Sequence, residues 1–144
     1  MKKYENFKSN LRVLESAENE DLSNEFIKSG IIDKFYIQFE LAWKAIKDFL
    51  KYEGVSEAKT GSPREIMMAA YKYYGFVDEV KWLGMLSDRN DTAHIYDGDA
   101  ADRLIEKILN SYIGEFKEME SYFDERYGDT FSVLRSYFCV KNEG

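Results

Sequence analysis

Apolar side chains recur every three or four residues along most of the chain, which is the spacing of a helix with one buried face. Between residues 3 and 20 one such stripe is formed by Tyr4, Phe7, Leu11 and Leu14. A longer stretch, residues 23–53, repeats the pattern with charged residues in most of the gaps. Both segments are predicted to be amphipathic helices, the second about 45 Å long at roughly 1.5 Å per residue.

Local signals predict where the following helices begin and end. The run Ser62-Pro63-Arg64-Glu65 is typical of a helix start, because serine caps, proline suits the first helical position and glutamate completes a capping box. This third helix is expected to run to about Tyr74, and a fourth to begin near Val77. Asp99 is a candidate N-cap for a last long helix over residues 99–127.

The sequence predicts an all-α, up-and-down helical bundle of about five helices, of the four-helix-bundle type, over residues 1–128. One proline and nine glycines are too few turn residues for a sandwich of many short strands. Residues 129–144 are apolar enough to predict an extension that packs on the bundle or on a partner.

The chain is expected to be a cytoplasmic protein with no membrane span. No stretch of about 18 apolar residues is present, and the first residues do not form an apolar signal core. A single cysteine, Cys139, indicates a reducing compartment.

Charge and residue counts exclude several classes of function. The net charge of −7 argues against a large duplex-binding surface, and one cysteine with one histidine excludes a Cys/His zinc site within one chain. No motif for a cofactor or metal is found, so neither is expected. Asp102 and Glu106 are interpreted as solvated charge, and a row formed by Lys44, Lys47 and Lys51 as a solvated helix face.

One polar cluster interrupts the apolar pattern, at residues 88–97, Asp-Arg-Asn-Asp-Thr-Ala-His-Ile-Tyr-Asp. It contains the only histidine of the chain, His94. On a straight helix Arg89 and His94 would point about 140° apart. They can therefore meet at one ligand only through a bend, through the reach of arginine, or across a symmetric pair of subunits.

The chemistry of this cluster suits phosphodiester cleavage. Histidine can take the proton of a ribose 2′-hydroxyl or protonate the leaving oxygen. Arg89 can hold a phosphate and stabilise developing charge, and Asn90 can fix an orientation without charge. The residues alone leave open an alternative in which Arg89 is surface charge and His94 is hydrogen-bonded in a helix cap.

The pattern Arg89-Asn90-x3-His94-x-Tyr96, at the end of the fourth predicted helix, resembles the signature of the HEPN superfamily. More narrowly, the chain is similar to the branch of nucleotidyltransferase substrate-binding proteins, also described as HEPN toxins of HEPN/MNT toxin–antitoxin pairs. The resemblance covers about residues 3–127. It includes Phe39-Glu40-Leu41-Ala42-Trp43-Lys44, the helix start at residues 62–65, and the segment 82–96.

The resemblance implies a metal-independent endoribonuclease toxin that forms a homodimer through the motif-bearing helices. Arg89 and His94 would be its catalytic residues at the dimer cleft, with Asn90 in support and RNA as the substrate. It also implies a cognate minimal nucleotidyltransferase antitoxin that attaches AMP to Tyr96. The alternative is a non-catalytic substrate-binding subunit of a two-component nucleotidyltransferase, which the acidic balance and the apolar tail favour.

Overall fold

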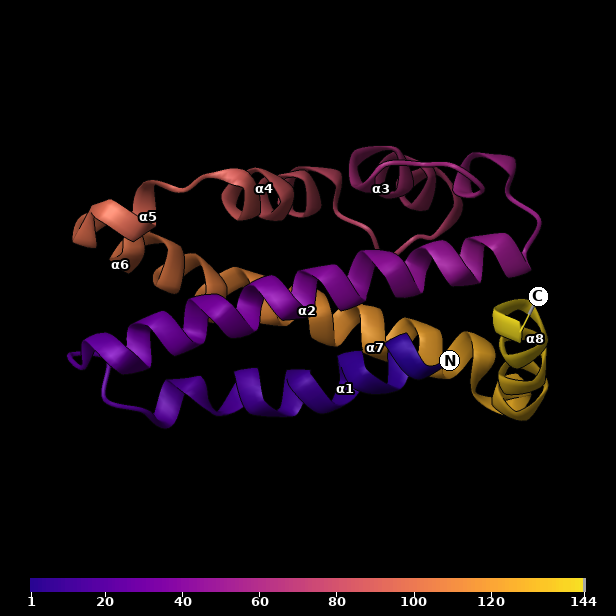
Figure 1. Cartoon of the computed structure of the whole chain (residues 1–144), viewed down its shortest axis with the longest axis horizontal. Coiled ribbons are helices and arrows are strands. Elements are labelled where there is room, and N and C mark those ends of the chain that lie inside the picture. The colour runs from indigo at the N-terminus through magenta and orange to yellow at the C-terminus, as the bar shows by residue number, and fades with distance from the viewer. Residues whose placement is uncertain (144) are drawn as a thin grey trace.

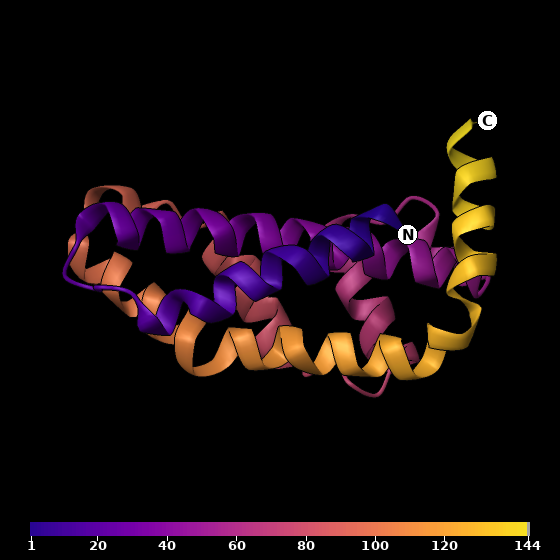
Figure 2. The ribbon, with the colours of Figure 1, turned by 90° about the horizontal axis from the view of Figure 1, so that it is seen from below.

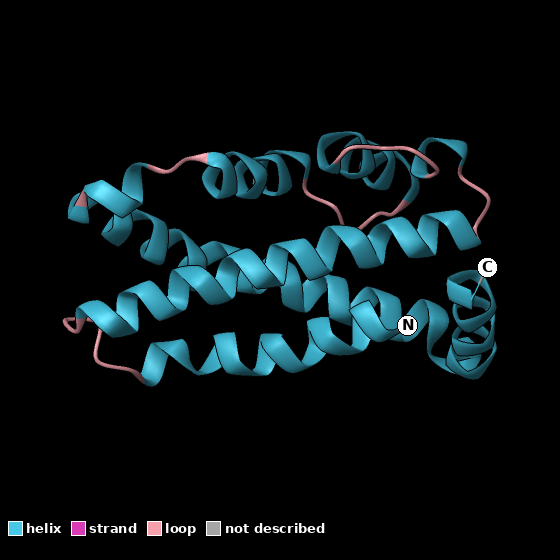
Figure 3. Cartoon of the chain, in the orientation of Figure 1, coloured by secondary structure: helices cyan, strands magenta, loops and turns pink. Residues whose placement is uncertain are grey.

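The computed structural model describes residues 1–143, and the side chains of residues 1–139, as helices joined by short turns (Figures 1 and 3). The helices are α1 (Lys2–Glu15), α2 (Glu25–Tyr52), α3 (Pro63–Tyr73), α4 (Glu79–Asn90), α5 (Ala93–Tyr96), α6 (Gly98–Lys107), α7 (Ile113–Tyr127) and α8 (Phe131–Glu143). No strand occurs within residues 1–143. The predicted all-α bundle is confirmed.

The long helix α2 is the centre of the bundle. α1 packs along it, and α3, α4 and α6 contact it as well (Figure 1). Figure 2 shows α6 and α7 (orange) running as one bent rod along the lower edge of the view. The apolar stripes of these helices meet in a core whose fully buried side chains include Phe7, Leu11, Phe35, Phe39, Ile46, Phe116 and Phe123.

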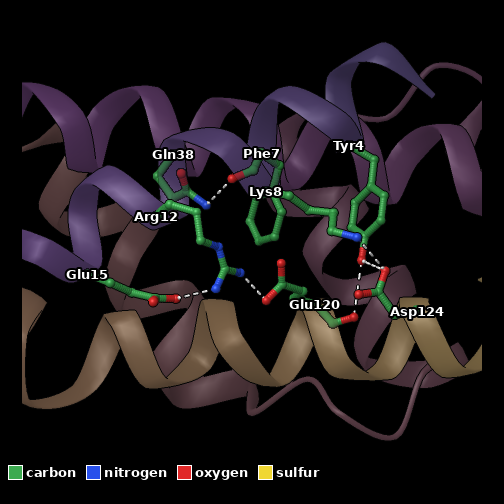
Figure 4. Close-up of polar contacts among 8 residues, drawn as sticks. All are labelled: Tyr4, Phe7, Lys8, Arg12, Glu15, Gln38, Glu120 and Asp124. Carbon is green, nitrogen blue, oxygen red and sulfur yellow. Dashed lines mark hydrogen bonds and ion pairs between the residues drawn. The ribbon is translucent and has the colours of Figure 1, made fainter.

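Polar contacts fix α1 to its two neighbours (Figure 4). The hydroxyl of Tyr4 donates to Asp124 Oδ1 at 2.8 Å, and Lys8 Nζ lies 3.0 Å from the same oxygen. On the α2 side, the buried Gln38 donates from Nε2 to the carbonyl of Phe7 at 3.0 Å. α1 is thus held by hydrogen bonds to α7 and to α2, in addition to its apolar stripe.

Two of the local signals for the third helix, the serine cap and the proline in its first turn, are confirmed. Ser62 is the N-cap of α3, and its Oγ accepts the backbone N–H of Glu65 at 3.3 Å. Pro63 is the first residue of the helix. α4 begins at Glu79, slightly later than predicted, because Asp78 caps it and accepts the N–H of Lys81 at 3.1 Å.

The prediction of one last long helix over residues 99–127 is wrong in two details. Its N-cap is Asp97 and not Asp99, because Asp97 Oδ1 accepts the N–H of Asp99 at 2.9 Å. A π-helical turn, Ile108–Tyr112, also divides it into α6 and α7. A π turn inserts one residue into the helical register and re-aims the side chains beside it.

The C-terminal helix α8 crosses the end of the bundle (Figure 2). Among its side chains up to residue 139, Leu134 and Phe138 are buried, and the ring of Phe138 lies 6.4 Å from that of Phe49. Arg135 Nε donates to Glu5 of α1 at 2.9 Å. Over residues 1–143, no helix has both the length and the apolarity that a membrane span needs.

Candidate functional site

The polar cluster lies at a break between two helices, at one end of the bundle (Figure 1, left). α4 ends at Asn90, and Asp91 has an extended backbone with φ −83° and ψ 123°. The carboxylate of Asp91 accepts the N–H of Ala93 at 2.9 Å and so starts α5, which has four residues and no buried side chain. Of the three routes that could bring Arg89 and His94 to one ligand, the structure contains the bend.

Arg89 is held against α2 by an ion pair. Its Nη2 donates to a carboxylate oxygen of Glu40, and its Nη1 lies 3.4 Å from Asn90 Oδ1. The side chain of Arg89 is 31% exposed. Because a guanidinium has five N–H donors, one edge can bind Glu40 while another stays open to a second anion.

His94 is held against the same helix by a tyrosine. The hydroxyl of Tyr36 lies 2.8 Å from Nε2 of His94 and 3.2 Å from Nδ1, and the two rings meet edge to face at 5.4 Å. Burial raises the pKa of Tyr36, as do the nearby carboxylates of Asp91 and Asp33, so the hydroxyl keeps its proton at neutral pH. Tyr36 can therefore donate to an unprotonated ring nitrogen of His94.

The two anchors are neighbours on α2. Tyr36 and Glu40 are four residues apart on one helix, so their side chains share a face. Arg89 and His94, which a straight helix would separate, are consequently attached to adjacent turns of α2. They do not contact each other directly within the described structure.

On its other side the end of α4 is tied to the α6–α7 rod. The hydroxyl of Tyr112 donates to Asp88, and Lys107 Nζ lies 3.3 Å from the same carboxylate. Burial raises the pKa of Tyr112, with a further contribution from Asp88. A Cβ at Gly84 would lie 3.3 Å from the Tyr112 hydroxyl, so glycine at this position leaves room for the contact.

Two hollows flank His94. One, of about 140 Å³, lies between α5 and α6 and is lined by Asp88, Asp91, Asp97, Arg103 and Lys107, among others. The other, of about 350 Å³, opens toward α2 and includes Lys28, Asp33 and Tyr96. Tyr96 is 88% exposed, so its phenol is accessible from solvent.

The structure brings some of the predicted residues together and adds others. Arg89, Asn90 and His94 lie at one bend, while Tyr96 stands at its exposed rim. Sequence reasoning missed Tyr36 and Glu40 as members of the site. Periodicity carries no signal for them, because Glu40 occupies one of the charged gaps between the apolar positions of α2 and Tyr36 adjoins the buried Phe35. Among the described residues, no three His, Cys, Asp or Glu side chains gather as they would around a metal ion.

Residues 2–125 match the model of the family described as "Nucleotidyltransferase substrate binding protein like". The chain belongs to this family. The match spans α1 to α6 and most of α7, so it contains the whole bend and both anchors on α2. α8 lies outside it. No curated protein matches the chain.

Membership in the nucleotidyltransferase substrate-binding family confirms the resemblance seen in the sequence. The family description also ties the chain to a nucleotidyltransferase.

Proposed function

We propose that this chain is the HEPN-type toxin of a toxin–antitoxin pair, a metal-independent endoribonuclease whose Arg89 and His94 act at the cleft of a homodimer. A partner nucleotidyltransferase silences it by attaching AMP to Tyr96. The observation that carries the proposal is the attachment of Arg89 and His94 to adjacent turns of α2. A phosphate clamp and an acid–base group held side by side are what phosphodiester cleavage needs.

The proposed reaction is a transfer within the RNA strand. Unprotonated His94 takes the proton of a ribose 2′-hydroxyl, the 2′-oxygen bonds to phosphorus, and the bond to the 5′-oxygen breaks. The leaving 5′-oxygen takes a proton from the protonated His94 of the second protomer. The products are a 2′,3′-cyclic phosphate and a 5′-hydroxyl, so neither water nor a metal is consumed in this step.

Glu40 and Tyr36 act as positioning residues in this scheme. Glu40 orients the guanidinium of Arg89, which can present its remaining donors to the non-bridging phosphate oxygens. Tyr36 orients the imidazole of His94 through its hydroxyl. Glu40→Gln keeps a hydrogen-bond acceptor but removes the charge, so it should alter the salt dependence of RNA binding more than the folding of the chain.

The proposed silencing uses the exposed tyrosine. The Tyr96 oxygen attacks the α-phosphorus of ATP, pyrophosphate leaves, and the phenolic proton passes to a base of the nucleotidyltransferase. The product places a phosphodiester on the rim of the hollow that His94 also lines. A negatively charged group at that rim would compete with an RNA phosphate for the site.

The test is expression of the chain alone, followed by an RNA cleavage assay on purified protein in the presence of a chelator. Wild type should inhibit growth and cut RNA, and Arg89→Ala and His94→Ala should each lower cleavage by about a hundredfold or more. Lys117→Ala, at an exposed lysine of α7, serves as the charge-change control. If both site variants stay toxic and cut RNA at the wild-type rate, the nuclease proposal is wrong.

A second candidate function is a non-catalytic subunit that presents a substrate group to the nucleotidyltransferase. It is favoured by the ion pair that already occupies Arg89, together with the exposure of Tyr96. This function predicts a stable complex with the enzyme, a gain of mass at Tyr96 with ATP, and no cleavage of any RNA. RNA cleavage by the isolated chain that is lost in His94→Ala would exclude it.

A further inference from the structure

A third hollow is lined by residues from the start of α1, the end of α2 and α8. These elements meet at the end of the bundle opposite α5 (Figure 1, right). The volume of this hollow is about 430 Å³, larger than either hollow beside His94. Its polar lining consists of Lys3, Asp48, Lys51, Lys59 and Tyr137. We call this hollow the lysine cleft.

The lysine cleft carries an excess of positive charge in an acidic protein. Its single carboxylate, Asp48, lies 3.5 Å from Lys3. Lys51 and Lys59 are exposed and have no carboxylate partner among the side chains of residues 1–139. Two ammonium groups without a carboxylate partner, lining one hollow, attract an anion to that place although the net charge of the chain is −7.

The row formed by Lys44, Lys47 and Lys51, interpreted from the sequence as a solvated face, is divided by the structure. Lys44 lies 3.5 Å from Glu40 and over the ring of Trp43 at 5.8 Å, so it belongs to the surroundings of Arg89. Lys51 lines the cleft instead. Two lysines of this row, Lys44 and Lys51, therefore belong to two different parts of the surface.

A tight turn after α2 brings Lys59 to the same hollow as Lys51. Gly54 has a φ of 78°, which favours glycine, and the N–H of Val55 donates to the carbonyl of Leu50 at 3.0 Å. The turn continues into a short 3-10 helix, Ser56–Ala58, whose Ala58 is fully buried. Both lysines thus extend from backbone that is fixed by hydrogen bonds or by burial.

Aromatic side chains line the same hollow as the lysines. Tyr137 of α8 lines the cleft and meets Tyr52 edge to face at 5.4 Å, while Phe138 beside it is buried. Aromatic rings bind the flat face of a nucleobase, and ammonium groups bind phosphates. The volume lies within the range of small-molecule sites, roughly 300–1,000 Å³.

We propose that the lysine cleft binds a phosphorylated mononucleotide, with the base against Tyr137 and the phosphates between Lys51 and Lys59. Lys3 also binds the phosphates once its ion pair with Asp48 opens. This site goes beyond the proposed function, because it lies at the other end of the bundle from Arg89 and His94.

The experiment is calorimetric titration of the whole chain with ATP, inorganic tripolyphosphate and adenosine in separate arms. ATP should bind about tenfold more tightly than tripolyphosphate or adenosine, because it alone engages both the lysines and the ring. Lys51→Ala/Lys59→Ala should lower the affinity for ATP about tenfold or more. The charge-matched pair Lys72→Ala/Lys117→Ala, at exposed lysines elsewhere, should leave it within about twofold.

The ring is tested separately from the charges. Tyr137→Leu should reduce the affinity for ATP to that for tripolyphosphate, and Tyr137→Phe should retain it. Equal binding of ATP and tripolyphosphate to the wild type would overturn the proposal of a nucleotide site. Absence of ATP binding, or an equal loss in the Lys72/Lys117 pair, would overturn it as well. Because Lys51, Lys59 and Tyr137 line a different hollow from the two that His94 lines, the binding outcome is independent of the nuclease assay.

Discussion

The end of the bundle that carries Arg89 and the end that carries Phe49 are built on different principles. At the Phe49 end the rings of Phe49 and Tyr127 stack at 4.6 Å, and Phe123 lies 4.5 Å from Phe49. At the Arg89 end α5 buries no side chain, and its contacts with α2 are polar. One end holds the fold together, so the other can present polar groups that contribute little to it.

The largest expected effect tests that division directly. Phe49→Ala should lower the free energy of unfolding by about 3–5 kcal/mol, because it opens a cavity among packed rings. Ile95→Ala, at a side chain that is 62% exposed, should change it by less than about 0.5 kcal/mol. Urea unfolding of both variants measures the difference. Equal losses would mean that α5 is part of the cooperative core.

The next effect is a loss of stability in alkaline solution that arises at the aromatic end. Burial raises the pKa of Tyr74 and of Tyr127. The pKa of Tyr4 is raised by burial and by the hydrogen bond to Asp124. An unfolded tyrosine ionises near pH 10. Because the folded pKa values are higher, their contribution to stability is complete below about pH 10 and is lost as the pH rises above it.

Each such tyrosine lowers the free energy of unfolding by at most about 1.4 kcal/mol per pH unit in that window. Thermal unfolding between pH 8 and pH 11 measures the slope. Tyr127→Phe removes one titrating group, so its melting temperature should fall less steeply above pH 10 than that of the wild type. An unchanged slope would show that Tyr127 does not carry the effect.

The contrast between the two ends also explains what could be predicted from the sequence. The stripes that form the core, and caps such as Ser62, are local patterns, and α2 and α3 begin and end within about two residues of where these patterns place them. α1 ends earlier than predicted, at Glu15, because a 3-10 helix, Ser16–Asn19, takes up the rest of that segment. The π turn was missed because Ile108 and its neighbours fit a continuous helix equally well. The contact of Tyr112 with Asp88, distant in sequence, accompanies the turn and is invisible to helical periodicity.

The candidate site divides in the same way. Arg89, Asn90 and His94 could be named because they are close in sequence and polar where the pattern is apolar. Tyr36 and Glu40 could not, because their roles depend on which face of α2 meets the bend. Asp97 and Asp99 are equally good caps by residue type, and the end of α5 decides between them.

A smaller effect concerns the hydrogen bond that ties the end of α4 to the α6–α7 rod. Tyr112→Phe removes the hydroxyl that donates to Asp88 and should lower the free energy of unfolding by about 1 kcal/mol. Because Asp88 precedes Arg89 directly, the variant should also lower RNA cleavage without changing the pH profile set by the histidine. Urea unfolding and cleavage rates measure the two changes. A loss of stability with full cleavage would separate this contact from the site.

The smallest effect on stability should accompany the largest effect on modification. Tyr96→Phe, at a side chain that is 88% exposed, should leave the free energy of unfolding within about 0.5 kcal/mol of the wild type. It should nevertheless prevent the gain of mass on incubation with the partner nucleotidyltransferase and ATP. Tyr71→Phe, at another exposed tyrosine, is the matched control and should be modified like the wild type.

Intact-mass measurement of these two variants decides whether the polar end is a substrate as well as a candidate catalyst. If Tyr96→Phe still gains the mass of AMP, the acceptor is another side chain and the proposed silencing is wrong. If only Tyr96→Phe escapes modification and remains toxic in the presence of the partner, the exposed phenol is the control point of the bend. In that case the packed rings around Phe49 would stabilise the fold, while Tyr96 would stay exposed for modification.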